Sequence, residues 1–260
     1  MKIASYNVNS IKARLELLSL WLEHRGSDID ILCLQETKTI DQTFPFEALK
    51  ELGFECTISG QKAYNGVAIC SKLSVTDIKY GFLDPYFDMQ KRIISVKIND
   101  INIINIYAPH GALRGEEKYL YKLGWFDRLF TFLNENYTPN DNIIILGDFN
   151  VALTDKDVYD PIALFDIAAT MQEERDALNK IIEFGLIDCF RHVNKDDGMY
   201  SWWSYSGAAI WNNLGMRIDY LLATKSMLPK LVNIDIDLWP RRKKNITPSD
   251  HAPIVAEFIF

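Results

Sequence analysis

Residues 142–150 read Asn-Ile-Ile-Ile-Leu-Gly-Asp-Phe-Asn, an apolar run that ends in polar side chains. The strongly apolar run Asn142–Leu146 predicts a β-strand. Asp148 and Asn150 follow this strand and face the same way in an extended chain, while Gly147 lets another group approach the backbone closely. Because reactive groups of α/β proteins gather at the carboxyl ends of strands, this stretch indicates an α/β fold with a polar site at a strand end.

The same arrangement occurs twice nearer the start of the chain. Asn7 and Asn9 follow a predicted strand at Lys2–Tyr6, and Gln35-Glu36 follows another at Asp30–Leu34. Three strand ends that carry polar residues can converge on one patch, so we expect these side chains to share a site with Asp148.

Helical spacing and strand patterns alternate along the chain. Helices are predicted at Ile11–Glu23, Phe46–Leu52, Glu116–Asn134 and Gln172–Phe184. Further strands are predicted at Gly66–Cys70, Ile93–Ile98, Ile101–Tyr107, Arg217–Thr224 and Pro253–Phe258. Hairpins together with crossover helices imply mixed sheets packed face to face with helices outside. No linker or repeat divides the chain, so we expect residues 1–260 to form one domain.

Composition predicts a soluble, cytoplasmic protein without a membrane partner. Hydrophobic residues make up 48% of the 260 residues, which is ample for a core. No apolar run reaches the roughly 18 residues that span a bilayer, and the residues after Met1 turn polar too soon for a signal peptide. The cysteines Cys33, Cys56, Cys70 and Cys189 are scattered, so we expect reduced core thiols.

Charge counts against generic nucleic-acid binding but does not exclude a nuclease. The formal net charge is 28 − 35 = −7, whereas nucleic-acid-binding proteins usually carry a basic excess. A nuclease that gathers carboxylates around a cation spends acidic residues on that site. The dense basic run Arg241–Lys244 is either a solvated loop or a phosphate-contacting segment.

A carboxylate adjoins an imidazole just before the last predicted strand, in Ser249-Asp250-His251-Ala252-Pro253. A hard oxygen ligand beside a group that titrates near neutrality suits metal-assisted hydrolysis. Each of these short motifs is weak when taken alone.

Together the motifs resemble the exonuclease III family of abasic (AP) endonucleases, in the endonuclease/exonuclease/phosphatase superfamily. The segments that carry the resemblance are Ser5–Asn9, Leu34–Lys38, Asn105–Pro109, Gly147–Asn150, Arg217–Tyr220 and Ser249–Pro253, in family order. The resemblance implies a four-layer α/β sandwich. It also implies a Mg²⁺-dependent DNA repair nuclease, with Mn²⁺ as a substitute, that cuts 5′ of abasic sites and at damaged or free 3′ ends of double-stranded DNA.

The resemblance also implies a metal site. Glu36 would be the main magnesium ligand, with Asn7 and Asp250 ordering the site. Further members of the metal site would be Asp148, Asn150 and His251. Glu36 could instead pair with Lys38 on the surface, and a lone Asn7 is more often a turn residue.

Catalytic roles follow from the same resemblance. Asp148 would position or activate the attacking water, held by Asn150, and Tyr107 would donate a hydrogen bond to a phosphate oxygen. His251 would contact the phosphate and be oriented by Asp219, which would raise its pKa and fix its tautomer. Whether Asp148 or His251 takes the proton of the water stays open. Tyr107 and Asp219 could instead be core residues.

The DNA-binding residues are expected on two kinds of surface. By the same resemblance, the family pocket that accepts a bare sugar would map onto Trp202, Met216 and Ile218. Alternation along a strand predicts that one of Trp202 and Trp203 is core. An exposed Trp211 could act as a wedge between base steps. Candidates for phosphate contacts are Lys62, Lys91, Arg92, Arg217 and Arg241–Lys244. His110 stands where relatives show Asn or Gln.

Two other functions remain possible on sequence grounds. Non-specific DNases, inositol-phosphate phosphatases and sphingomyelinases share the core site, and fold does not fix substrate. A catalytically inactive DNA-binding protein is the second alternative, although no catalytic position that the resemblance carries over is lost. We expect a monomer without an obligate protein partner.

Overall fold

Two six-stranded β-sheets form the centre of the computed structural model, which describes residues 1–25 and 27–260. The first sheet has the order β13-β14-β1-β2-β4-β3 and the second the order β5-β6-β7-β8-β12-β9. The strands of the first sheet are β1 (Lys2–Asn7), β2 (Ile31–Gln35), β3 (Glu55–Ser59), β4 (Val67–Ser71), β13 (Leu231–Ile236) and β14 (Ile254–Phe258). Those of the second are β5 (Val75–Tyr80), β6 (Ile93–Ile98), β7 (Ile101–Tyr107), β8 (Ile143–Asp148), β9 (Leu186–Asp188) and β12 (Asp219–Thr224). A short ribbon pairs β10 (Trp202–Trp203) with β11 (Gly215–Met216).

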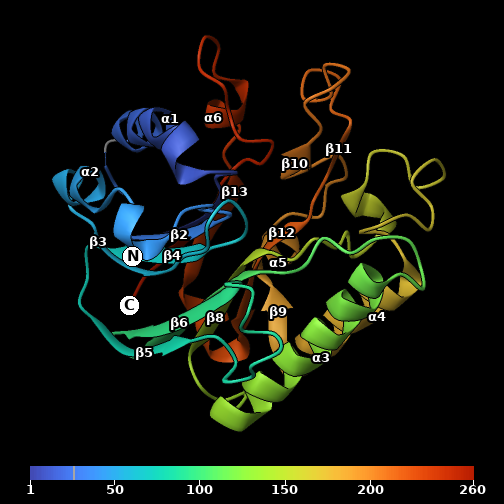
Figure 1. Ribbon diagram of the computed structural model, residues 1–260, viewed down its shortest axis with the longest axis horizontal. Helices are drawn as coiled ribbons and strands as arrows, with labels where there is room; N and C mark the ends of the chain where they lie inside the picture. Colours follow the sequence, from blue (N-terminus) through green and yellow to red (C-terminus); the bar gives the residue numbers. More distant parts are fainter. Residues whose placement is uncertain (26) are drawn as a thin grey trace.

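Helices cover the outer faces of both sheets (Figure 1). The helices are α1 (Ile11–His24), α2 (Phe46–Glu51), α3 (Glu117–Asn136), α4 (Gln172–Glu183), α5 (Cys189–Val193) and α6 (Trp239–Arg242). Three short 3-10 helices occupy Asp41–Thr43, Asp155–Asp157 and Lys225–Lys230. Helices α1 and α2 lie on the first sheet, and α3 and α4 lie on the second, so the predicted four-layer sandwich is confirmed.

Successive side chains of β8 pack alternately against the helix layer and against the other sheet. Ile143 and Ile145 belong to the cluster beneath α3, whereas Ile144 and Leu146 belong to the cluster between the sheets. Both faces are buried, which explains why the sequence shows a continuous apolar run instead of an apolar–polar alternation.

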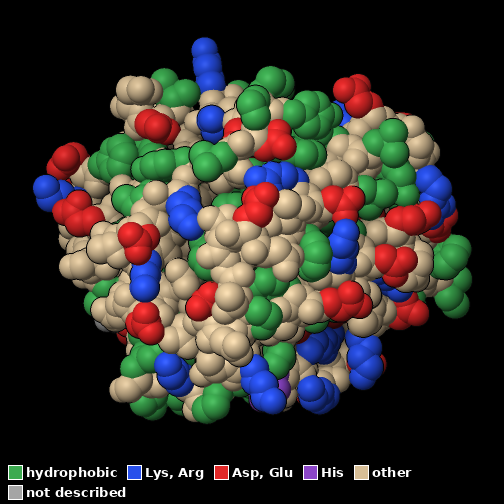
Figure 2. Space-filling model, turned by 90° about the horizontal axis from the view of Figure 1, so that it is seen from below, with side chains coloured by type: hydrophobic (Ala, Val, Ile, Leu, Met, Phe, Trp, Pro, Cys, Tyr) green, Lys and Arg blue, Asp and Glu red, His purple; other side chains and the backbone are tan. Residues whose placement is uncertain are grey.

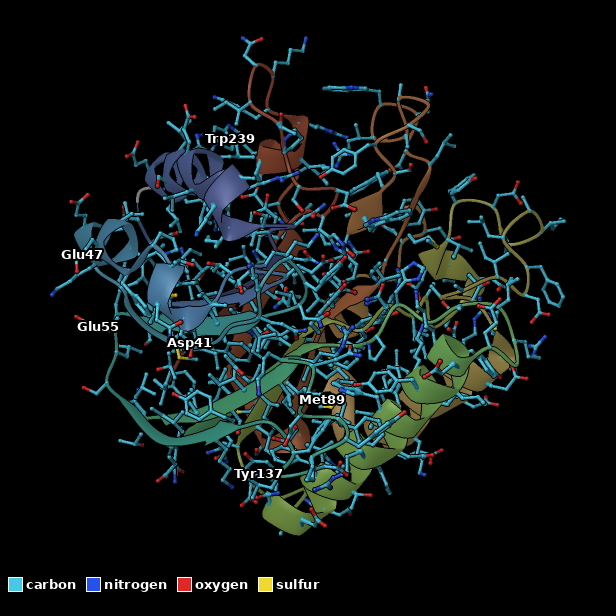
Figure 3. All side chains as sticks on the ribbon, in the orientation of Figure 1. Asp41, Glu47, Glu55, Met89, Tyr137 and Trp239 are labelled. Carbon is cyan, nitrogen blue, oxygen red and sulfur yellow. A yellow bond between two sulfur atoms is a disulfide. The ribbon has the colours of Figure 1, made fainter. Side chains whose placement is uncertain are left out.

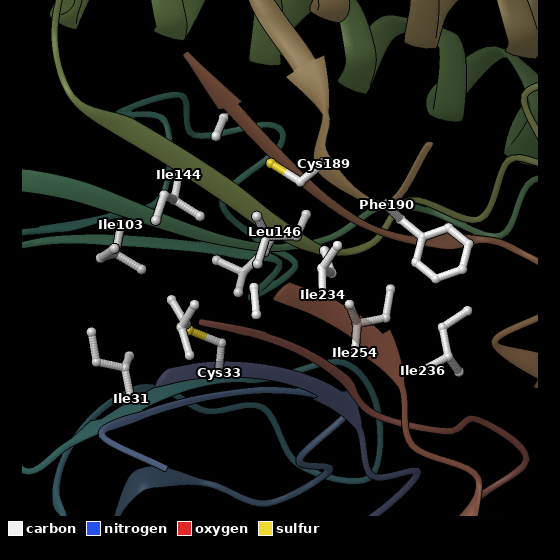
Figure 4. Close-up of a cluster of buried hydrophobic side chains, with 14 of the residues drawn as sticks. Ile31, Cys33, Ile103, Ile144, Leu146, Cys189, Phe190, Ile234, Ile236 and Ile254 are labelled. Carbon is white, nitrogen blue, oxygen red and sulfur yellow. The ribbon is translucent and has the colours of Figure 1, made fainter. Parts of the chain in front are cut away.

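The inner core is built mainly from branched aliphatic side chains of the two sheets. Figure 4 shows Ile31 and Cys33 of β2 opposite Ile103, Ile144 and Leu146 of the second sheet. Branched residues suit this position because they pack well on pleated surfaces. The core holds the two sheets face to face.

The outer layers carry aromatic contacts and mixed charge. Trp239 lies beside α1 (Figure 3), and its ring stacks on His24 with centroids 4.4 Å apart. The face on the side of α3 and β5 carries acidic and basic side chains intermixed (Figure 2). None of the described helices combines the length and apolar character needed to cross a membrane.

One prediction about the cysteines is wrong. Cys56 of β3 lies directly opposite Cys70 of β4 in the antiparallel register, and the two form a disulfide. Cys33 and Cys189 are free and buried, as expected of core thiols. The strand β3 was not predicted from the sequence, so the pairing of Cys56 with Cys70 was not visible there.

Candidate active site

The two parallel strand pairs bring the predicted site residues to one end of the sandwich. In the first sheet β1 and β2 end side by side, with Asn7 paired to Gln35. In the second sheet β7 and β8 end side by side, with Tyr107 paired to Asp148. The antiparallel strand β12 begins at the same level, because Asp219 pairs with Asp148.

Asn7 connects the two halves of the site. Its side-chain Nδ2 donates to Glu36 Oε1 and to Asp148 Oδ2, each at 2.9 Å, and its Oδ1 accepts from the Asn9 backbone N–H at 3.0 Å. The side chain is fully buried. Asn7 therefore orders two carboxylates that come from different sheets.

Glu36 sits in a tight turn just after β2. Its backbone has a φ of 50°, and its Oε2 lies 2.8 Å from Lys38 Nζ. Burial alone would raise the pKa of Glu36, but the hydrogen bonds from Lys38 and Asn7 lower it. Glu36 is therefore an anion near neutral pH, and it pairs with Lys38 while belonging to the site.

Asn150 holds the Asp148 carboxylate from both sides. The Asn150 backbone N–H donates to Asp148 Oδ1 at 2.8 Å, and Asn150 Nδ2 lies 3.3 Å from Asp148 Oδ2. The same Nδ2 donates to the Ala108 carbonyl at 2.9 Å. Asn150 adopts a φ of 53°, in the left-handed region that asparagine tolerates better than most residues.

His251 is fixed by Asp219, as the resemblance implied. The Nδ1 of His251 is 2.8 Å from Asp219 Oδ2, and that oxygen also accepts from Ser201 Oγ at 2.6 Å. With Nδ1 bound in this way, His251 Nε2 faces Asp148 Oδ2 at 3.7 Å. Ser201 was not predicted as a site residue; its position before two tryptophans gave no sign of this contact.

Burial and neighbouring charges determine the protonation states of His251 and Asp148. Burial alone would lower the pKa of His251, but the carboxylates of Asp219 and Asp148 raise it to about 10. Burial raises the pKa of Asp148, and the charge of His251 partly offsets this effect. His251 is therefore a cation near neutral pH, with both ring nitrogens as donors.

Tyr107 borders the site from the end of β7. Burial and the charges of Glu36 and Asp148 raise the pKa of its hydroxyl well above the ordinary value, so the hydroxyl stays protonated and can donate. The Arg92 guanidinium lies 4.6 Å from the centre of the Tyr107 ring, and its Nη1 donates to the Tyr107 carbonyl at 3.1 Å.

Three of the predicted residues could hold a metal ion. Glu36, Asp148 and His251 each offer one atom within 4.8 Å of the others. The two carboxylates suit a hard cation. His251 fits less well as a ligand, since its Nδ1 is bound to Asp219 and a protonated imidazole has no free lone pair. Asp250 lies outside this group.

Trp202 connects the polar site to an apolar cluster. The side chains of Trp202 and Met216 pack on a buried cluster that contains Ile218, and Trp202 pairs with Met216 between β10 and β11. Trp202 Nε1 donates to Asp250 Oδ2 at 3.0 Å, and Trp202 also forms a β-bridge with His251. Trp203 belongs to the core between the sheets, as alternation predicted.

The structure corrects part of the expected phosphate-contacting set. Arg217 is fully buried, with Nε 2.8 Å from Asp157 and Nη1 2.8 Å from Asp188, so it cannot reach a phosphate as placed. Arg92 and Arg241 are also buried. By contrast, the side chains that remain exposed are Lys62, Lys91, Arg242, Lys244, His110 and Trp211.

Comparison with known proteins identifies the family. The profile of the Endonuclease/Exonuclease/phosphatase family matches residues 4–251. The chain belongs to this family. A member of it, the exodeoxyribonuclease of Bacillus subtilis, is 31% identical over 255 residues, with 98% of both chains covered. The exodeoxyribonuclease III of Haemophilus influenzae is 32% identical over 274 residues, covering 99% of this chain and 100% of its own. The resemblance to the exonuclease III branch is thereby confirmed.

Solved structures of the family agree with the fold. An AP endonuclease from Archaeoglobus fulgidus superposes with a TM-score of 0.94 at 36% identity, and the match covers all of both chains. The 3′ phosphatase NExo from Neisseria, solved with a product DNA hairpin, superposes with a TM-score of 0.92 at 35% identity and the same coverage.

Proposed function

We propose that this DNA repair nuclease of the exodeoxyribonuclease III type is magnesium-dependent and cuts double-stranded DNA 5′ of abasic sites and at damaged or free 3′ ends. The observation that carries the proposal is an apolar cluster beside the polar site. Trp202, which packs with Met216 on the cluster that contains Ile218, donates a hydrogen bond to Asp250 and forms a β-bridge with His251. These apolar side chains would receive a sugar without its base beside the reacting phosphate.

Glu36 and Asp148 would hold the magnesium ion, and Asn7 would orient both carboxylates. Bound Mg²⁺ offsets the negative charge that builds up on the phosphate oxygens. Asn7 Oδ1 accepts one hydrogen bond, from the Asn9 backbone N–H, and keeps a second lone pair. Asp250, Asn150 and His251 act around the ion in this proposal, not as its ligands.

The remaining groups would act either on the attacking water or on the phosphate oxygens. Asp148 is held on both oxygens and lies beside Asn7, so it would orient the attacking water and accept its proton. His251, bound to Asp219, would donate through Nε2 to a phosphate oxygen. Tyr107 would donate to another phosphate oxygen. This division follows from the contacts, and the raised pKa of His251 agrees with it.

Two features support DNA over other substrates of the superfamily. The apolar side chains of Trp202 and Met216, which pack on the cluster that contains Ile218, suit a bare deoxyribose and offer little to a polyanionic inositol phosphate. The named relatives and structural neighbours act on DNA according to their names.

We further propose that residues 1–260 act as one catalytic domain and as a monomer.

The test is cleavage of a labelled duplex that carries one central tetrahydrofuran site, with Mg²⁺, Mn²⁺ or EDTA. We expect metal-dependent cleavage immediately 5′ of the site, supported by Mn²⁺ as well. A Glu36→Gln variant keeps the shape and the Asn7 hydrogen bond of the side chain but loses its charge, and we expect it to require far more Mg²⁺.

The outcome also separates the related activities. A 3′-phosphorylated duplex and an undamaged recessed duplex are assayed in parallel, because the neighbour NExo is a 3′ phosphatase and exonuclease. An intact tetrahydrofuran duplex with processed 3′ ends would restrict the proposal to the 3′-end activities. An absence of any DNA cleavage with either metal would refute it.

A further inference from the structure

Helix α3 carries a buried ammonium group close to the site. Lys122 is fully buried, and its Nζ lies 2.6 Å from Glu174 Oε1, in the first turn of α4. Glu174 is fully buried as well. A buried ion pair stabilises a fold little more than an apolar pair of the same size. Stability alone therefore does not explain why Lys122 and Glu174 are buried here.

The other two donors of the ammonium bind backbone carbonyls on either side of the site. Lys122 Nζ donates to the Asn150 carbonyl at 2.7 Å and to the His110 carbonyl at 3.2 Å. All three N–H groups of the ammonium are thereby used. Lys122 thus ties the loop after β7 to the loop after β8, and Glu174 fixes the ammonium between them.

Asn150 transmits this contact to the Asp148 carboxylate. Its carbonyl is held by Lys122, while its backbone N–H and its side-chain amide hold Asp148. Because Asn150 has a left-handed backbone, its peptide groups need partners at both ends to stay in place.

The loop after β7 packs directly on the ion pair. Gly111 has a φ of 83°, and a Cβ added there would lie 2.9 Å from Lys122 Cδ and 3.1 Å from Glu174 Oε1. The glycine therefore allows the loop to approach close enough for the His110 carbonyl to reach Lys122.

We propose that Lys122, anchored by Glu174, is a positioning residue for the hydrolysis: it fixes the Asn150 and His110 carbonyls and so sets the orientation of Asp148 toward the attacking water. The inference rests on the proposed function, since it assumes that Asp148 acts on the water. It predicts that loss of the ammonium affects the chemical step more than DNA binding.

The test compares Lys122→Met with Leu133→Ala in the full-length protein, on the tetrahydrofuran duplex with Mg²⁺. Leu133 lies on the same helix, about three turns beyond Lys122, and is fully buried but has no polar group, so it controls for lost stability. Both variants are assayed well below their melting temperatures. For Lys122→Met we expect kcat to fall about 10- to 100-fold, the effect of one charged hydrogen bond, with KM changed by less than about twofold. Leu133→Ala should keep the kcat of the wild type.

A milder variant keeps the inference testable if Lys122→Met does not fold. Glu174→Gln retains an oxygen that accepts from Lys122, and we expect a smaller fall in kcat, again without a change in KM. Equal kcat in all folded variants and the wild type would overturn the inference while leaving the proposed function intact. An inactive wild type would instead refute the proposed function itself.

Discussion

Substituting Arg217 by methionine separates a structural role from a DNA-binding role. The sequence made Arg217 a candidate for a phosphate contact, whereas the structure buries it between Asp157 and Asp188. Its guanidinium also lies 4.4 Å from the centre of the Tyr220 ring. Methionine keeps much of the side-chain volume and removes only the charge and the donors.

The size of the effect follows from what the variant leaves behind. Asp157 retains Arg191, at 2.7 Å, but Asp188 loses its ion pair with Arg217. Removing one partner of a buried ion pair costs about 3–5 kcal/mol. For a chain of this size each kcal/mol lowers the melting temperature by about 2–4 °C, so we expect Arg217→Met to melt about 6–20 °C below the wild type.

The pH dependence has a defined sign. Burial alone would raise the pKa of Asp157, but Arg217 and Arg191 lower it below the ordinary value of 3.8. A lowered carboxylate pKa stabilises the folded state above 3.8, and this stabilisation is lost as the pH falls through the folded-state pKa. The difference in melting temperature between Arg217→Met and the wild type should therefore be largest at pH 7 and should become smaller only in acid.

The difference in melting temperature is measured by thermal unfolding at pH 7, followed by circular dichroism. DNA affinity is measured by fluorescence anisotropy with the tetrahydrofuran duplex in EDTA. Lys91→Met is the matched control, because Lys91 is exposed. We expect Lys91→Met to weaken DNA binding without changing stability. An Arg217→Met protein that melts like the wild type but binds DNA more weakly would refute the structural role.

Three further substitutions test the site. Trp211→Ala should weaken binding of the tetrahydrofuran duplex by about tenfold without changing stability, since the side chain is 58% exposed; unchanged affinity by anisotropy would exclude the wedge. Asp219→Asn should lower kcat by roughly 100-fold or more, because His251 loses the carboxylate that keeps it protonated; steady-state kinetics with an unchanged kcat would contradict the role of His251. Gly147→Ala should destabilise the protein by more than about 3 kcal/mol, because its Cβ would collide with the Ile106 carbonyl of the paired strand; urea unfolding with a wild-type midpoint would disprove that packing.

The buried strands could be predicted from the sequence because their composition alone defines them. Ile143–Asp148 is apolar throughout its first four residues, and the hairpin of β6 and β7 turns at Asn99 and Asp100 as expected. Edge strands escaped prediction. Val75–Tyr80 mixes apolar with polar residues, is mostly exposed and carries a bulge, so its sequence shows no regular buried face. Glu55–Ser59 is also an edge strand with only its last residues buried.

The grouping of the candidate site residues was predictable where a motif at a strand end contains them, and the contacts of distant residues were not. Asp148, Asn150 and His251 follow or precede strands, and the structure brings them together. The burial of Arg217 depends on Asp157, 60 residues away, and no local pattern reveals that pairing. Lys122 looks like any lysine on an amphipathic helix until α4 brings Glu174 to it.

The two halves of the site come from different sheets, so their separation must be fixed by something between the sheets. Buried amides do this directly below the site. Gln35, next to Glu36, donates to Asn105 Oδ1 at 2.7 Å, across the gap between β2 and β7. Asn105 Nδ2 in turn donates to the carbonyls of Leu34 and Ala68, at 2.9 and 2.8 Å. An apolar contact would tolerate sliding of one sheet over the other, whereas hydrogen bonds have a narrow range of length and angle. The buried amides therefore hold Glu36 and Asp148 at a defined separation, which a metal site shared between two sheets requires.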